Sequence, residues 1–264
     1  MKAISCLLLP SVMTWLFLGV SSAEDELSQL AASKRSACLL LTIDISPIVS
    51  IHSDGVFISD DGLALVSSEA VNLSRNQKPA IVTADGSRLE FGTVLGIFPD
   101  QSLALIKFNH RPKSWLRIAP EEPSADADAG AGDGDAIALI TVNREVLLDG
   151  KVPPLVGQII AKRSESTQDL HGLRFSKILS LGASPSREQL AILGTGSAAI
   201  NRDGDLVACL AGWHPQRGQL LIHLTPVTSL VDQVKQAVAR DKPIPFPLPD
   251  AYNTSDLVVT DVDW

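Results

Sequence analysis

Short apolar runs separated by turn residues dominate the chain, and this pattern limits the folds open to it. The runs are rich in β-branched and aliphatic residues and include ACLLLTIDI, GVFIS, LALVS, AIVTA, LALIKF, AIALITV, LVGQIIAKR and DLVACLAGW. Turn signals stand between them, as in SDDG at 59–62, ADGS at 84–87 and NRDGD at 201–205. Because helices do not alternate with these runs, the pattern predicts an antiparallel barrel or sandwich rather than a parallel α/β sheet.

A break near the middle of the chain divides the runs into two groups. Residues 121–135, EEPSADADAGAGDGD, are small and acidic and lack apolar periodicity, so we expect a solvated loop there. The segments on either side, 36–120 and 136–240, hold similar numbers of runs. The sequence therefore predicts two β-barrels joined by an acidic loop.

A helix is predicted only near the end of the chain. Thr225 and Pro226 open the segment VTSLVDQVKQAVAR, in which valine and leucine recur at helical spacing. A proline at 226 suits the first turn of a helix. Residues 241–264 are rich in proline and then acidic and partly apolar, and we expect an extended or loosely packed terminus.

The first 23 residues resemble a secretory signal peptide. A single lysine precedes an apolar stretch from about Cys6 to Val20, and small residues follow at Ser21, Ser22 and Ala23. We therefore expect cleavage after Ala23, a secreted or periplasmic location and no stable membrane span after cleavage. An uncleaved anchor is the alternative, but the stretch is shorter than the ~20 residues of a membrane span and Pro10 interrupts it.

Charge and cysteine content narrow the classes of partner and cofactor. The formal net charge is −8 and no basic run occurs, so a nucleic-acid partner is not expected. The five histidines are scattered and no Cys-x-x-Cys pair occurs, so neither a metal nor another cofactor is expected. After cleavage Cys38 and Cys209 remain, either as a disulfide or as small buried hydrophobic residues.

Four segments, in this order, carry a resemblance to a known family. They are IHSDGVFISDDGLALVSSEAV, TADGSRLEFGTVLGIFPDQSLALIKF, GDAIALITVN with VGQIIAKRSE, and LGTGSAAINRDGDLVACLAGW. Together they resemble the HtrA/DegP-type branch of the trypsin-like serine peptidases over most of residues 36–240. The resemblance implies an all-β fold of two six-stranded antiparallel β-barrels with a C-terminal helix. Some two dozen residues follow that helix, so no PDZ domain is expected.

The resemblance places the catalytic histidine of the family at Glu69, its aspartate at Ser102 and its nucleophile at Thr195. Ser197 is the alternative nucleophile position if the loop is one residue shorter. A carboxylate with a pKa near ~4.3 is a poor acceptor for a hydroxyl proton, and a serine supplies no charge to orient an imidazole. Without the triad, at most about 10³–10⁴-fold acceleration over water would survive. The sequence therefore predicts an inactive peptidase homologue, a pseudopeptidase.

A substrate groove can still bind a peptide after the catalytic residues are lost, because the edges of such barrels can bind an extended peptide as an added strand. The resemblance places the possible groove at Gly194, Gly196, Ala211, Gly212, Trp213 and His214. Glu69 itself is either a solvated carboxylate or a contact for a basic side chain of a peptide.

Two other functions stay open from the sequence. In the first, an active peptidase uses Thr195 or Ser197 with a base such as Glu69 or His214, and Asp100 as a displaced acid. His52, His110, His171 and His223 are less favourably placed, and a surface or satisfied histidine is the favoured reading for His214 as well. In the second, the protein is a structural or scaffolding protein whose partners contact the proline-rich tail or the acidic loop.

Overall fold

The computed structural model describes most of the chain between residues 25 and 246. The described ranges are 25–46, 49–74, 78–120, 135–142, 154–163, 167–168, 174–175, 178–183, 186, 189, 193–216 and 219–246. The predicted signal peptide, nearly all of the acidic loop and most of the tail lie outside the described residues, as does His171.

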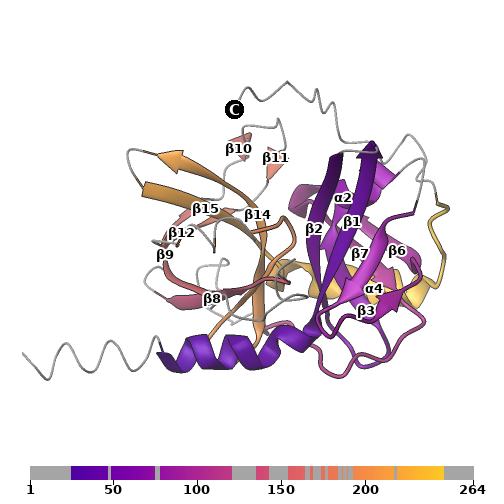
Figure 1. Cartoon of the computed structure of the whole chain (residues 1–264), viewed down its shortest axis with the longest axis horizontal. Helices are drawn as coiled ribbons and strands as arrows, with labels where there is room; N and C mark the ends of the chain where they lie inside the picture. Colours follow the sequence, from indigo (N-terminus) through magenta and orange to yellow (C-terminus); the bar gives the residue numbers. More distant parts are fainter. Residues whose placement is uncertain are drawn as a thin grey trace, which may run out of the picture.

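The N-terminal half is one antiparallel sheet that follows the predicted strand runs. Its strands are β1 (Cys38–Ser46), β2 (Val49–Phe57), β3 (Leu63–Ser67), β4 (Ala80–Thr83), β5 (Arg88–Leu89), β6 (Thr93–Phe98) and β7 (Leu103–Lys107). They lie in the order β5-β4-β1-β2-β3-β7-β6. Figure 1 shows this half in indigo to magenta. The sheet has seven strands rather than six, because the two-residue β5 adds a short hairpin partner to β4.

The C-terminal half is a closed barrel of six strands in the order β12-β15-β14-β13-β8-β9. Its members are β8 (Ala136–Ile140), β9 (Leu155–Arg163), β12 (Ile178–Ala183), β13 (Ala198–Ile200), β14 (Leu206–Gln216) and β15 (Gln219–Pro226). A separate pair is formed by β10 (Thr167–Gln168) and β11 (Arg174–Phe175). The expected all-β architecture of two antiparallel barrel-like halves with a C-terminal helix is confirmed.

The helices are short and lie around the two halves. They are η1 (Arg35–Ala37), α2 (Ser68–Leu73), η3 (Pro99–Gln101), η4 (Thr228–Leu230) and α4 (Val231–Arg240), with a further helix at residues 25–34. The predicted C-terminal helix is present, but Pro226 ends β15 instead of opening the helix. None of the helices in the described ranges is long and apolar enough to cross a membrane.

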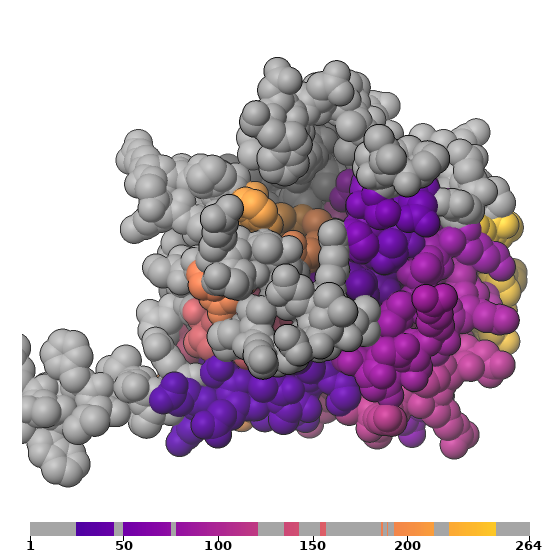
Figure 2. All heavy atoms as spheres, in the orientation of Figure 1, coloured from indigo at the N-terminus to yellow at the C-terminus, as the bar shows by residue number. Residues whose placement is uncertain are grey.

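The helix at residues 25–34 was not predicted from the sequence, yet it contributes to the main core. It runs along the lower edge of the molecule in Figures 1 and 2, where it is coloured indigo. Leu27 and Ala31 are buried in a cluster that also holds Leu40 and Val56 of the N-terminal half and Ile140 of the C-terminal half. The two halves therefore share one apolar core instead of meeting across a wet interface.

Cys38 and Cys209 belong to this shared core, where both are fully buried and carry free thiols. Burial raises the pKa of the Cys209 thiol to about 12. Burial also raises the pKa of Cys38 far above its usual range, and nearby Asp54 adds to the effect. Of the two alternatives for Cys38 and Cys209, a disulfide or small buried hydrophobic residues, the structure shows the second.

The segment between the halves is fastened to the start of β14. The Leu206 N–H donates to the Arg117 carbonyl at 2.8 Å, and the Ala119 N–H donates to the Leu206 carbonyl at 2.9 Å. The Arg117 guanidinium also donates twice to the Asp205 carboxylate, from Nε at 3.0 Å and from Nη2 at 2.5 Å. This two-pronged contact fixes the direction in which the chain enters the second half.

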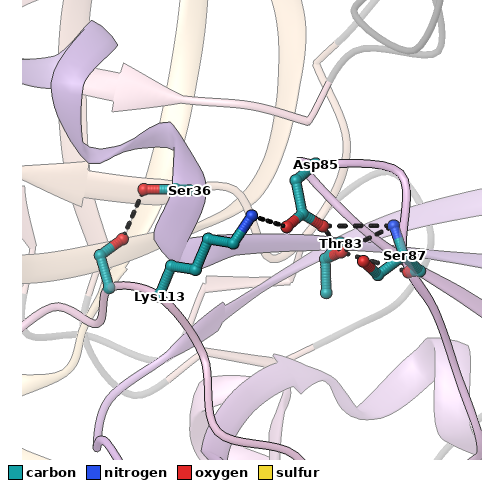
Figure 3. Close-up of polar contacts among 6 residues, drawn as sticks. Ser36, Thr83, Asp85, Ser87 and Lys113 are labelled. Carbon is teal, nitrogen blue, oxygen red and sulfur yellow. Dashed lines mark hydrogen bonds and ion pairs between the residues drawn. The ribbon is translucent and has the colours of Figure 1, made fainter.

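A second polar cluster joins the β4–β5 hairpin to the loop that contains Lys113 (Figure 3). Asp85 accepts from Thr83 Oγ1 at 2.5 Å and from Lys113 Nζ at 2.7 Å. The neighbouring Ser114 hydroxyl lies 2.6 Å from that of Ser36 in η1. The bond from the Lys113 ammonium, followed by those from Thr83 and Ser87, holds the pKa of Asp85 well below its usual range.

We expect Asp85→Asn to lower stability only above acidic pH. Because the folded-state pKa of Asp85 is depressed, its contribution is present above the ordinary carboxyl pKa of ~4 and is lost as the pH falls below it. The side chains of Asp85 and Lys113 are 36% and 77% exposed, so the loss should be only about 0.5–1 kcal/mol at neutral pH. Urea unfolding of wild type and variant across pH 2–7, the range around that pKa, checks this. An equal difference at both ends of the range would contradict it.

Candidate functional site

The three positions that the resemblance assigned to the catalytic triad lie in α2, at the end of η3 and in the turn before β13. Glu69 stands in the first turn of α2, half-buried, and Ser102 ends η3 in the left-handed conformation with φ of 52°. The Ser68 N–H donates to the Ser102 carbonyl at 2.9 Å, which joins the first two elements. Thr195 lies in the turn before β13, next to Gly196.

Gly196 packs this turn against β2 and the end of β3. A Cβ at this position would lie 2.2 Å from the Asp54 carbonyl oxygen and 3.2 Å from the Ser67 backbone nitrogen. The φ of Gly196 is also positive, at 89°, so only glycine fits for both reasons. The left-handed residue of the loop is therefore Gly196, and Ser197 is not among the residues with positive φ.

The groups of Thr195 are bonded to β2. Its carbonyl accepts from the Asp54 N–H and from the Ser53 hydroxyl, each at 2.8 Å. Its own hydroxyl lies 3.4 Å from Ser53 Oγ. The partner of this hydroxyl is thus another hydroxyl, which cannot accept a proton as a general base does.

Ser197 is buried and bonded to a carboxyl group that sequence reasoning did not single out. Its Oγ lies 2.6 Å from Asp54 Oδ2 and 2.6 Å from the Gly194 carbonyl oxygen. Ser197 is 0% exposed and Asp54 is 2% exposed. Since a hydroxyl has one proton, the whole donor capacity of Ser197 is used inside the protein. In the sequence, Asp54 stands as a single carboxylate directly before the apolar run GVFIS, and this position was the feature that could have indicated it.

The predicted groove wall forms part of β14. Trp213 is 43% exposed, and a Cβ at Gly212 would meet no atom of the described residues within 4 Å. The pairing of β14 with β15 shifts register between Leu210 and Gly212, so Ala211 occupies a bulge. This stretch of the strand therefore presents an aromatic ring beside open space. The side chain of His214 lies outside the described part of the structure.

His52 and His110 contact residues of the N-terminal half, whereas His223 lies in the strand that pairs with the predicted groove wall. The Nδ1 atom of His52 lies 3.0 Å from Thr42 Oγ1 on the neighbouring strand, and the ring of His110 lies 5.8 Å from that of Phe57. His223 lies opposite Gly212 in the β14–β15 ladder. Asp100 is exposed in η3. Within the described ranges, no group of three or more His, Cys, Asp or Glu side chains is arranged to hold a metal ion.

Two antiparallel barrel-like halves define the fold of the trypsin-like serine peptidases, and solved structures agree. An HtrA-type protease, AlgW with a tripeptide, is similar with a TM-score of 0.57 and 16% identity, covering 80% of this chain and 63% of that one. The Rv3671c protease from M. tuberculosis, in its active form, is similar with a TM-score of 0.58 and 14% identity, covering 80% of this chain and 84% of that one.

The chain therefore has the fold of the HtrA-type proteases, although it spans less than two thirds of the AlgW chain. No family model matches its sequence, and no curated protein does. At these identities the likeness establishes the fold, and the activities of the two proteases are not carried over with it.

We expect Ser197→Ala to lower the free energy of unfolding by about 1–3 kcal/mol, because it leaves the buried Asp54 carboxyl without this donor. Ser50→Ala is a matched control, since the Ser50 hydroxyl donates to Asp44 Oδ1 at 2.6 Å in an exposed position. That variant should change stability by less than about 0.5 kcal/mol. Urea unfolding measures both, and equal losses in the two variants would contradict the importance of the buried pair.

Proposed function

We propose that this protein is a trypsin-fold pseudopeptidase, secreted or periplasmic, that binds an extended peptide or an unfolded protein segment without cleaving it. The observation that carries the proposal is the state of the two candidate nucleophiles. The hydroxyl of Thr195 lies against Ser53, and the hydroxyl of Ser197 is buried against Asp54. Neither hydroxyl has an imidazole partner among the described contacts.

Glu69 does not replace the missing histidine chemically. A general base works best when its pKa lies near the operating pH, and an ordinary glutamate lies well below it. Ser102 supplies a hydroxyl where a serine peptidase uses a carboxylate to orient the imidazole. Among the contacts of the described residues, the Thr195 hydroxyl therefore has no base that could remove its proton.

The binding half of the proposal depends on the surface of β14. Gly212 leaves open space above the strand, and Trp213 offers an aromatic face next to it. An extended peptide can add to such a surface through its main chain, while an aromatic ring packs on its side chains. The solved AlgW structure contains a tripeptide, which is compatible with this use of the fold.

Catalytic silence is tested with the purified protein and two variants, Thr195→Ala and Ser197→Ala. Fluorogenic peptides and unfolded casein report turnover, and a fluorophosphonate probe reports an activated hydroxyl. We expect neither turnover nor labelling above buffer in any of the three proteins. Activity that disappears in Thr195→Ala would show an active peptidase with Thr195 as its nucleophile.

Peptide binding is tested separately by fluorescence anisotropy with labelled fragments of unfolded casein. We expect Trp213→Ala to weaken binding by about 5–30-fold, the usual effect of losing an aromatic anchor. Trp115→Ala is the matched control, because Trp115 is similarly exposed, at 44%, but is not part of β14. Equal weakening in both variants would place the binding surface away from the proposed groove.

A further inference from the structure

A groove of about 600 Å³ lies away from the triad positions, between β6, α4 and the segment after α4. Its lining residues are Leu95–Phe98, Gln233, Gln236, Ala237, Arg240 and Lys242–Pro245. The Ile244 N–H donates to the Val94 carbonyl at 2.8 Å, and the ring of Phe246 lies 4.9 Å from that of Phe91. The segment that forms one wall is therefore anchored to the sheet.

The base of the groove is apolar because α4 approaches β6 closely. A Cβ at Gly96 would lie 3.3 Å from the Ala237 Cβ and 3.2 Å from the Phe98 ring. Phe98 and Ala237 are buried, and Leu95 and Ile97 remain half-buried. A bound apolar side chain would find contact here without rearrangement of the core.

The polar side chains that line the groove are either positively charged or neutral. Arg240 and Lys242 are exposed, Gln233 and Gln236 supply amides, and no carboxylate is among the lining residues. Asp241 stands between the two cations in the chain, exposed, but does not line the groove. In a chain of net charge −8, this groove is a local site for negatively charged groups.

We propose that this groove binds an acidic, partly apolar peptide segment of another protein. Its carboxylates would contact Arg240 and Lys242, and an apolar side chain would lie against the half-buried Leu95 and Ile97. A volume of about 600 Å³ suits several side chains rather than a single small anion. The outer edge of β6 is already bridged at Val94 by Ile244, so the bound peptide would contact side chains of the groove and would not extend the sheet there. Two cations are too few for a nucleic-acid backbone.

The test uses anisotropy of the full chain with a labelled peptide, Leu-Asp-Val-Asp-Leu-Asp, and its neutral analogue, Leu-Asn-Val-Asn-Leu-Asn. We expect the acidic peptide to bind more tightly and to lose affinity as salt is added. The double variant Arg240→Gln with Lys242→Gln should weaken binding by about tenfold or more. Lys235→Gln is the matched control, since Lys235 lies on the same helix, 71% exposed, and does not line the groove.

Several outcomes would overturn the proposal. They are absence of binding, equal affinity for the acidic and neutral peptides, and equal effects of the groove and control variants. Displacement of the peptide by inorganic phosphate, or by an oligonucleotide at lower concentration than the peptide itself, would also overturn it. The result is independent of the β14 groove, because Trp213→Ala should leave binding of the acidic peptide unchanged. Thermal unfolding of each variant checks that these exposed substitutions leave the fold intact.

Discussion

The contact between β2 and the 194–197 loop is the constraint on which the site depends. It joins the two halves through main-chain and side-chain bonds at once, from Asp54 N–H to the Thr195 carbonyl and from Ser197 to Asp54 Oδ2. Gly196 allows this close approach, because any side chain there would collide with the Asp54 carbonyl. Since the same loop sits against the end of β3, the place of α2 and of Glu69 relative to Thr195 follows from this contact.

This contact also engages the two candidate hydroxyl groups of the loop. A nucleophile must be exposed and must have a base within reach, whereas here the hydroxyls of Thr195 and Ser197 stabilise the junction. The carboxyl of Asp54 is used in the same way, as a buried partner rather than as a member of a proton relay. On β14, the described residues of the predicted groove wall offer main chain and the exposed aromatic ring of Trp213.

The sequence predicted the local features of this fold well and its long-range contacts poorly. The strands and hairpins follow from apolar runs and turn residues, which are local signals, so the two halves and the C-terminal helix could be predicted. The helix at 25–34 was missed because its buried face consists mainly of Leu27 and Ala31, too few residues for a clear period. The bond between Asp54 and Ser197 spans 143 positions, and nothing in either neighbourhood indicates the other. Trp213 could be predicted as a groove residue, because the order of the motifs in the family resemblance assigns it to the groove wall.

The burial of both cysteine thiols in the shared core has a consequence for how the molecule opens. Cys38 belongs to the N-terminal half and Cys209 to the C-terminal half, and both are shielded by packing that the halves provide for each other. A thiol reagent can reach either sulfur only when that packing separates. Its reaction rate therefore measures how often the two halves separate. If the halves part as one event, the two thiols will be modified at a single rate, without any introduced label.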